Sequence, residues 1–251
     1  MAAGRLDPCC PTPVRPRDRK VLVLITGFPA AAFGTNCYVV APGPGEQAVV
    51  VDPGIDVVDQ LDEVLREHRL QPVAVLLTHG HLDHTFSVTP VCGARGIPAY
   101  LHPGDDHMLA DPLSGVSADT AALFGGRLQW SEPDDVRPLN DGEPLNLAGL
   151  QITVDHAPGH TPGSVAFRLP RAEADPEVML SGDLLFAGSI GRTDLPGGDT
   201  AQMMASLART VLTLDDDVVV LPGHGPETTV GRERATNPFL RNLAAAPARG
   251  L

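Results

Sequence analysis

The stretch Thr78-His79-Gly80-His81-Leu82-Asp83-His84 places three imidazoles and one carboxylate within six positions. It follows the apolar run of residues 73–77, which predicts a buried strand that ends at this stretch. A turn after a buried strand usually contains Gly, Asn or Asp, and three histidines exceed what such a turn needs. We therefore interpret the stretch as part of a metal site whose remaining ligands come from elsewhere in the chain.

Three positions further along the chain can supply those ligands. His160 lies in Ala157-Pro158-Gly159-His160-Thr161-Pro162-Gly163, Asp183 in Ser181-Gly182-Asp183, and His224 in Pro222-Gly223-His224-Gly225. Each follows a β-type run and has Gly or Pro beside it, which lets the backbone turn sharply and direct a side chain inward. Each alone is typical of a loop residue, but together with the clustered stretch they predict one site.

Charge and composition exclude several classes of partner. The net charge of −13 disfavours nucleic acid, which needs a basic surface, and disfavours an anionic membrane for the same reason. Lys20 is the only lysine, so an anionic substrate group would be held by arginines, backbone N–H groups or a metal. Residues 1–20 contain no apolar signal region, and no later run is long enough to span a membrane. We expect a cytoplasmic protein with a flexible arm at residues 1–20.

The cysteines fit a reducing compartment. Cys9 and Cys10 lie in the proline-rich arm, Cys37 and Cys92 lie among apolar residues, and none forms a Cys-x-x-Cys pair. We expect the first two to be reduced surface thiols and the last two to pack in the core.

Hydrophobic periodicity predicts the elements of the first half. Residues 21–26, 36–41 and 48–52 are predicted strands of an antiparallel meander, separated by Gly and Pro. An amphipathic helix follows at 56–69 with Asp56 as its cap. After the strand at 73–77 come a short helix at 85–96 and another strand at 97–101.

Residues 102–147 are less regular and too long for a plain connection, so they predict a cap insertion with a helix near 119–124. His102 and His107 lie in this segment, where contact with substrate or metal competes with an ordinary exposed loop position.

The second half returns to a β pattern. Strands are predicted at 150–155, 164–169, 178–180 and 218–221. A helix at 200–212 is predicted to have Thr200 as its cap, with an apolar face made of Met203, Met204, Leu207 and Val211. The tail at 230–243 is predicted to be helical with a break at Pro238. We expect one domain over residues 21–251.

The order His79-x-His81-x-Asp83-His84, then His160, Asp183 and His224, resembles the ligand order of metallo-β-lactamase-fold hydrolases over about residues 21–239. Within that superfamily, residues 185–194 and 236–240 resemble the short glyoxalase II-like (hydroxyacylglutathione hydrolase-like) proteins. The resemblance implies an α/β (α+β) fold, an αββα sandwich of two mixed β-sheets with helices on the outer faces.

The resemblance also implies roles for the seven residues. His79, His81 and His160 would hold one divalent metal, Asp83, His84 and His224 would hold a second, and Asp183 would bridge them. Ligation without cysteine suits zinc, but iron or manganese fits as well. In such a site a metal-bridging hydroxide attacks the substrate carbonyl, and Asp83 also orients the nucleophile.

The implied substrate is a small-molecule thioester such as S-lactoylglutathione. Arg192, Arg232, Arg234 and Arg241 are candidate contacts for the carboxylates of glutathione, and Asp194 is a further candidate substrate-binding residue. Few residues follow His224, so we expect the C-terminal helical domain of full-length glyoxalase II to be absent. Three alternatives stay open: a mononuclear iron persulfide dioxygenase using His79, His160 and Asp183, a lactonase or β-lactamase of the same fold, and a non-enzymatic binding module.

Overall fold

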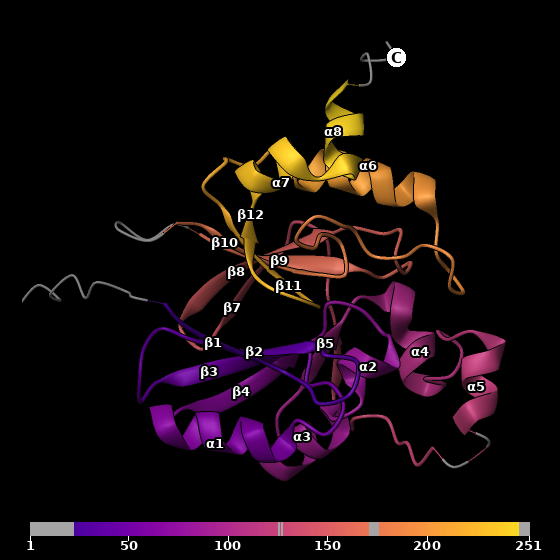
Figure 1. Ribbon diagram of the computed structural model, residues 1–251. Helices are drawn as coiled ribbons and strands as arrows, with labels where there is room; N and C mark the ends of the chain where they lie inside the picture. Colours follow the sequence, from indigo (N-terminus) through magenta and orange to yellow (C-terminus); the bar gives the residue numbers. More distant parts are fainter. Residues whose placement is uncertain (1–22, 125, 127, 171–175, 246–251) are drawn as a thin grey trace, which may run out of the picture.

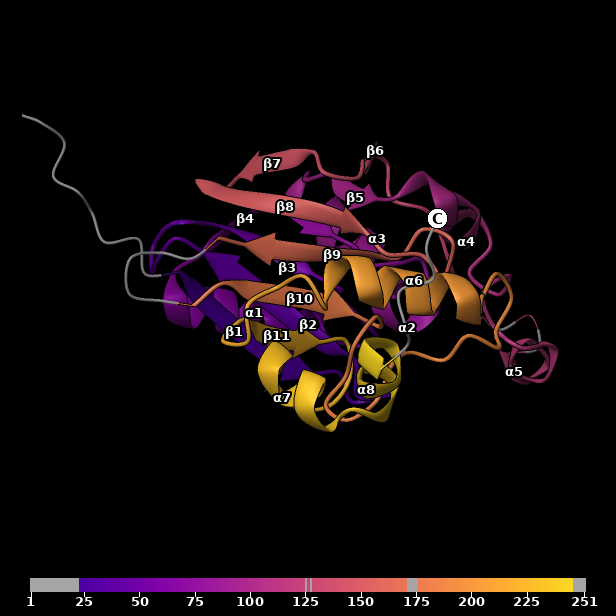
Figure 2. The same cartoon turned by 90° about the horizontal axis from the view of Figure 1, so that it is seen from above.

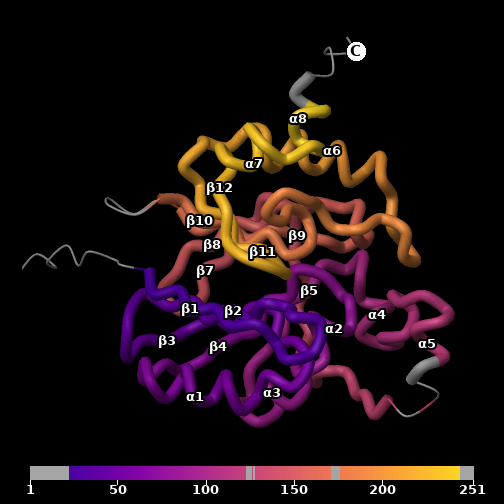
Figure 3. Tube along the Cα trace, in the orientation of Figure 1, coloured from indigo at the N-terminus to yellow at the C-terminus, as the bar shows by residue number. Residues whose placement is uncertain are grey.

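Each half of the chain builds one six-stranded β-sheet. The computed structural model describes residues 23–124, 126, 128–170 and 176–245, so the predicted arm at 1–20, with Cys9 and Cys10, lies outside the described residues. The first sheet has the order β1-β2-β3-β4-β5-β6 and the second the order β12-β11-β10-β9-β8-β7. Figure 1 shows the sheets stacked face to face, and the tube in Figure 3 shows the chain completing one layer before it enters the other.

The strands of the first sheet are β1 (Leu24–Pro29), β2 (Asn36–Ala41), β3 (Gln47–Val51), β4 (Gln71–Leu76), β5 (Ala99–Leu101) and β6 (Val136–Pro138). β1, β2 and β3 pair antiparallel, which confirms the predicted meander, and β3 to β6 pair in parallel. Parallel strands are buried on both faces, which explains the continuous apolar runs in β3 and β4.

The strands of the second sheet are β7 (Pro144–Leu147), β8 (Leu150–His156), β9 (Val165–Leu169), β10 (Val178–Gly182), β11 (Val219–Pro222) and β12 (Thr228–Thr229). β10 and β11 are parallel, and the other neighbours pair antiparallel. Both sheets are therefore mixed, as the resemblance implied.

The helices are α1 (Val58–His68), α2 (Leu82–Thr85), α3 (Val88–Arg95), the 3-10 turn η1 (Pro103–Asp105), α4 (Asp106–Ala110), α5 (Ala118–Phe124), α6 (Thr200–Thr210), α7 (Val230–Thr236) and α8 (Pro238–Ala245). Helices cover the outer face of each sheet, and α4 and α5 lie at one end of the sandwich (Figure 1). Figure 1 shows α1 and α3 beneath the first sheet and α6, α7 and α8 above the second, and Figure 2 shows α6 lying across β9 and β10. None of the helices in the described part of the chain is long and apolar enough to cross a membrane.

Three apolar layers hold the sandwich together. Leu61 and Val91 pack with Val50 between α1, α3 and the first sheet. The middle layer contains Leu76 and Phe167 from the facing sheets. The third lies between α6 and the second sheet, where Met203, Leu207 and Val211 are completely buried and Met204 is partly buried. The αββα architecture and the apolar face of α6 are thus confirmed, as is the burial of Cys37 and Cys92.

Two predicted helix caps are wrong. Asp56 has a φ of 57°, and Val57 occupies the cap position of α1 without a side-chain hydrogen bond. α6 is capped by Asp199, whose side chain accepts from the backbone N–H of Gln202, and Thr200 is its first residue. Asp199 has the extended dihedrals typical of a cap residue, with φ −146° and ψ 112°, whereas Thr200 already lies inside the helix.

Other element boundaries also differ from the prediction. The helix expected at 85–96 is two helices, α2 and α3, and α2 begins within the histidine stretch. The end of the expected insertion at 102–147 forms β6 and β7, which are edge strands of the two sheets, while the helix near 119–124 is present as α5. The helical break at Pro238 is confirmed, because α7 ends at Thr236 and α8 begins at Pro238.

Candidate metal centre

The seven predicted ligands follow strands from both sheets and meet at one edge of the sandwich. The histidine stretch follows β4, and His81 directly precedes α2. His160 lies in the turn between β8 and β9, Asp183 follows β10, and His224 follows β11. Because β10 and β11 are parallel neighbours, the residues after their carboxyl ends lie side by side.

Two glycines allow the loops to approach closely. Gly182 has a φ of 49°, and a Cβ there would lie 2.5 Å from Thr78 Oγ1. A Cβ on Gly223 would lie 2.3 Å from Asp183 Oδ1. Both distances are too short for a side chain, so Gly182 lets the loop after β10 approach the histidine stretch of the first sheet, and Gly223 lets the loop after β11 pack beside Asp183.

Three imidazoles form the first group of nitrogen atoms. His160 Nε2 lies 2.8 Å from His81 Nδ1 and 3.2 Å from His79 Nε2. All three side chains are at least 95% buried, since their exposed fractions are 1%, 5% and 2% for His79, His81 and His160. These residues are the group predicted for the first metal.

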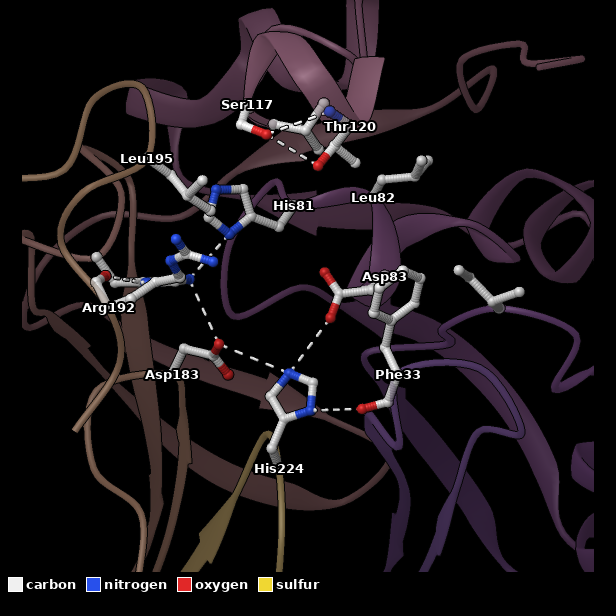
Figure 4. Close-up of a pocket in the computed structure, with 14 residues that line it drawn as sticks. Phe33, His81, Leu82, Asp83, Ser117, Thr120, Asp183, Arg192, Leu195 and His224 are labelled. Carbon is white, nitrogen blue, oxygen red and sulfur yellow. Dashed lines mark hydrogen bonds and ion pairs between the residues drawn. The ribbon is translucent and has the colours of Figure 1, made fainter. Parts of the chain in front are cut away.

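Asp83, His84 and His224 form a second group. His84 Nε2 lies 3.2 Å from His224 Nε2, and His224 Nε2 lies 3.2 Å from Asp83 Oδ2. Asp183 lies between the two groups, because its Oδ2 is 3.4 Å from His160 Nε2 and its Oδ1 is 3.3 Å from His84 Nε2. Figure 4 shows Asp183 and Asp83 on either side of His224.

In four of the clustered histidines, the ring nitrogen Nδ1 lies within hydrogen-bond distance of an oxygen atom. His79 Nδ1 lies 3.1 Å from Thr78 Oγ1, and His84 Nδ1 lies 2.9 Å from Asp52 Oδ2. The other two Nδ1 atoms face backbone carbonyls, at 2.7 Å for His160 with Arg192 and 3.2 Å for His224 with Phe33. Oxygen partners of this kind fix the tautomer in which Nε2 carries a free lone pair for a metal.

This arrangement fits two divalent cations. Ligand nitrogens around a tetrahedral zinc at its usual bond length lie about 3.3 Å apart, which is close to the separations in both groups. The structure contains three overlapping sets of residues whose ligand atoms lie within 4.8 Å of one another in each set: His79, His81 and His160; His79, His84 and Asp183; and Asp83, His84 and His224. Asp183 Oδ1 is buried without a hydrogen-bond partner among the described residues, a costly arrangement that a cation would relieve.

Without a cation, the charges in the cluster are divided between histidines and carboxylates. Burial and the neighbouring imidazoles lower the pKa of His79, and burial followed by His160 lowers the pKa of His81 to about 3. Burial also acts to lower the pKa of His84, but Asp83, Asp183 and Asp52 outweigh it and raise that pKa above its usual range. Burial acts to raise the pKa of Asp83 and Asp183, but His84 lowers both. Both carboxylates are therefore ionised, as metal ligation requires.

Three residues that support the cluster were missed by the sequence analysis. Asp52 accepts from Thr78 N at 2.8 Å and from Thr78 Oγ1 at 2.6 Å, and it also binds His84. Thr35 Oγ1 donates to Asp83 Oδ2 at 3.0 Å. Asp105 is completely buried and connects two ligand loops. A carboxylate directly after the buried strand β3 was a usable signal for Asp52, whereas Thr35 and Asp105 become visible only once the chain is folded.

The predicted substrate residues do not gather at one place. Arg192 lines the cavity above the cluster, and its guanidinium forms a two-bond ion pair with Asp194. Arg232, Arg234 and Arg241 are absent from the described lining of that cavity, and Arg234 instead binds Asp216 and the carbonyl of Leu214.

The two loop histidines are not part of the ligand sets either. The ring of His102 stacks on that of His156 at 3.9 Å, and His107 lies on α4.

A two-sheet αββα sandwich with a histidine and aspartate cluster of this kind at its edge defines a metallo-hydrolase. The chain belongs to the metallo-beta-lactamase superfamily, whose family model matches residues 30–224. The families of this fold bind divalent metal ions, and the clustered donors of this chain agree with that property.

Three proteins are similar to this chain in sequence over most of their length. The hydroxyacylglutathione hydrolase GloC of Haemophilus influenzae is 35% identical over 217 residues, which cover 86% of this chain and 97% of that protein. The crystal structure of BLEG-1 B3 metallo-beta-lactamase is 38% identical with a TM-score of 0.76, covering 86% of this chain and 99% of the other. The crystal structure of TTHA1623 in a di-iron-bound form is 42% identical with a TM-score of 0.69, covering 86% of this chain and 100% of the other.

Proposed function

We propose that the protein hydrolyses thioesters such as S-lactoylglutathione with two divalent metal ions, in the manner of glyoxalase II. The observation that carries this proposal is the meeting of seven donor side chains in overlapping sets within 4.8 Å. The 35% identity to the GloC hydroxyacylglutathione hydrolase supports the thioester as substrate. Zinc is the favoured metal because imidazole and carboxylate ligands suit it. Iron is the second candidate, because TTHA1623 has been crystallised in a di-iron-bound form, and manganese is the third.

The proposed mechanism assigns a separate role to each group of residues in the cluster. In this proposal His79, His81 and His160 hold one ion, Asp83, His84 and His224 hold the other, and Asp183 contacts both. Such ions supply an acidified water as nucleophile and polarise the substrate carbonyl. The hydrogen bond from Thr35 Oγ1 fixes the Asp83 carboxylate, which lets Asp83 orient the attacking water. The thiolate is a good leaving group, so the site needs no strong general acid.

Metal analysis combined with a thioester panel tests this proposal. We expect close to two metal ions per chain and cleavage of S-lactoylglutathione after loading with zinc, iron or manganese. A single iron per chain, with oxygen uptake on glutathione persulfide, would instead identify a dioxygenase that uses His79, His160 and Asp183. Absence of thioester cleavage with every metal would refute the thioesterase.

Substitution of Asp183 tests the proposed bridging role. Asp183→Ala is expected to lower kcat by at least about 100-fold, because removal of a centrally placed ligand disrupts the pair of ions. Metal content should fall below two per chain while the circular dichroism spectrum keeps its native shape. The matched control is Asp59→Ala on the exposed side of α1, which should leave metal content and turnover unchanged. Full turnover in Asp183→Ala would contradict the bridging role.

A β-lactamase is the second candidate, because BLEG-1 B3 metallo-beta-lactamase is 38% identical over most of both chains. The same donor set can direct a water to a ring carbonyl. A panel of penicillins, cephalosporins and lactones separates the two functions: a higher kcat/KM for these rings than for any thioester would favour the second candidate.

A further inference from the structure

The cavity above the metal centre is small and its walls are largely apolar. Its volume is about 280 Å³. Apolar side chains from separate parts of the chain line it together with two hydroxyl groups of the α5 region: Phe33, Ile55, Leu82, Val116, Leu195, Ser117 and Thr120. Figure 4 shows Phe33 on one side of the cavity, Leu195 and Arg192 on the other, and Ser117 and Thr120 on a third side. A cavity of this size accommodates the acyl group and the nearest part of a thiol carrier.

Arg192 is the one arginine or lysine among the described residues that line this cavity. It is already paired: its Nε donates to Asp194 Oδ1 at 2.7 Å and its Nη2 donates to Asp194 Oδ2 at 2.8 Å. This pair occupies the guanidinium fork, so a substrate carboxylate would have to displace Asp194 to bind Arg192, although both side chains are exposed, at 60% and 69%. Apart from the proposed metal ions, the described side chains of the wall therefore offer little net positive charge to an anionic carrier.

Phe33 contributes an apolar surface that folding alone does not explain. Its side chain is 68% exposed, and its φ of 61° lies in the left-handed region, which is unfavourable for a bulky residue. The carbonyl of Phe33 accepts a hydrogen bond from His224 Nδ1 at 3.2 Å, so the same residue also orients a predicted metal ligand. This contact keeps the exposed ring at the rim of the cavity, beside the centre.

From these observations we propose that the cavity selects thioesters with an uncharged, apolar portion of the thiol carrier next to the reacting bond, and that Phe33 and Leu195 determine this specificity. This inference rests on the proposed thioesterase function and narrows its substrate class. Water cleaves the acyl C–S bond, and the products are the carboxylic acid and the free thiol. The carrier is recognised by contact with Phe33 and Leu195, and carboxylate recognition contributes little.

A series of thioesters with one acyl group and three carriers tests the proposal. The lactoyl thioesters of N-acetylcysteamine, N-acetylcysteine and glutathione have zero, one and two carboxylates on the carrier. With metal-loaded protein, kcat/KM is expected to be highest for the N-acetylcysteamine thioester, by about fivefold over the glutathione thioester, a ratio that equals about 1 kcal/mol. A kcat/KM that is higher for the glutathione thioester than for the uncharged one would overturn the proposal.

Two variants assign the selectivity to the apolar wall. Phe33→Ala and Leu195→Ala are each expected to raise KM for the N-acetylcysteamine thioester about fivefold with little change in kcat, because contact area is lost and the metal ligands stay in place. Phe239→Ala is the matched control, since Phe239 is also an exposed aromatic residue but does not line the cavity. Unchanged KM in both wall variants, with native metal content, would contradict the assignment.

A third variant tests the role of the ion pair. Asp194→Asn leaves the Arg192 guanidinium free to bind a carboxylate, so KM for the glutathione thioester should fall while KM for the uncharged thioester stays constant. Equal changes for both substrates would show that the pair does not control carrier charge.

Binding of inert analogues separates this inference from the proposed function. S-butyl-N-acetylcysteamine and S-butylglutathione contain a thioether that cannot be hydrolysed, and calorimetry measures their Kd directly. Tighter binding of the uncharged thioether supports the carrier specificity even if no thioester is turned over, in which case the thioesterase alone fails. Tighter binding of S-butylglutathione refutes the carrier specificity whether or not thioesters are cleaved.

Discussion

At the scale of single residues, Asp105 is the carboxylate that connects two of the ligand loops. Its Oδ2 accepts from Gly80 N at 2.9 Å and from Thr161 Oγ1 at 2.6 Å, and its Oδ1 accepts from Gly163 N at 2.6 Å. The residue is completely buried, and these three bonds satisfy its charge. Asp105 thereby fixes the loop of His79 and His81 relative to the loop of His160.

Removal of this carboxylate should destabilise the protein and loosen the site. Asp105→Ala is expected to lower the free energy of unfolding by about 3 kcal/mol, because three donors lose a charged, buried acceptor. Urea denaturation measures the change, and metal affinity should fall in parallel. The neighbouring Asp106→Ala, at an exposed position, should change stability by no more than about 0.5 kcal/mol. Equal effects at the two positions would contradict the connecting role.

The clustering of these histidines and aspartates could be predicted from the sequence, whereas the residues that support them could not. Three histidines in one short stretch exceed the needs of a turn, and single ligands such as Asp183 stand out through their Gly neighbours. Asp105 gives no comparable signal, because it is one of two adjacent aspartates in an irregular segment. Its hydrogen-bond partners Thr161 and Gly163 lie 56 and 58 positions further along the chain, so no local sequence pattern connects them to Asp105.

At the scale of elements, α6 fixes the second sheet through one buried face. Met203 and Leu207 pack against the outer face of this sheet, and Met204 is partly buried beside them. The sequence predicted this face because the apolar positions recur with the helical period.

Truncation of the two methionines should have unequal effects. Met203→Ala is expected to lower the free energy of unfolding by about 3 kcal/mol, because the side chain is fully buried and leaves a cavity. Met204→Ala, at a partly buried position, should cost about 1 kcal/mol. Urea denaturation distinguishes these values. Similar losses of stability at both positions would contradict the assignment of Met203 to the buried face of α6 and of Met204 to its margin.

The cap of α6 gives a pH-dependent prediction. Hydrogen bonds from the backbone and side chain of Gln202 lower the pKa of Asp199. Because the folded pKa lies below the unfolded value of about 3.9, the stabilisation by the charge is complete above about pH 5 and is lost as the pH falls through the folded pKa.

Asp199→Asn keeps an acceptor for the cap but removes the charge. Its melting temperature should lie below that of the wild type at pH 7, and the difference should narrow as the pH falls from 5 to 3. A difference that stays constant over this range would show that the charge of Asp199 is irrelevant to α6.

Elements were predictable where their pattern is local and strong. β2 was predicted with its observed ends, and the break between α7 and α8 follows from Pro238. The cap of α6 was misplaced because Asp199 and Thr200 are adjacent polar residues and the backbone dihedrals decide which of them is the cap, whereas α1 begins without any side-chain cap. β6 and β7 were missed as strands because they are short edge strands of the two sheets, where few residues need to be apolar.

At the scale of the whole molecule, the candidate metal centre lies where loops of the two sheets meet. Each predicted ligand set contains residues from the stretch after β4 and at least one residue from the second sheet's loops. Ions that bind only the folded protein therefore stabilise the docked arrangement of the two sheets.

Metal removal should lower thermal stability measurably. At a free metal concentration of about 1,000 times Kd the stabilisation is about 4 kcal/mol, so chelation is expected to lower Tm by about 10 °C. Differential scanning calorimetry with and without a chelator measures the shift, and addition of excess metal should restore the original Tm. An unchanged Tm after verified metal removal would show that the centre does not contribute to holding the sheets together.

Because the proposed ligands come from loops of both sheets, metal binding depends on how much of the chain has been synthesised. The first donor, His79, leaves the ribosome long before His224, and neither proposed set is complete until strands of both halves have been made. A nascent chain that stops before β10 offers His79, His81 and His160, the proposed first set, but lacks Asp183 and His224, so we expect it to retain a single metal ion weakly. Metal uptake by chains arrested at successive lengths would then rise in two steps, after His160 and after His224 have emerged, and the second step would record when the two halves of the newborn chain dock.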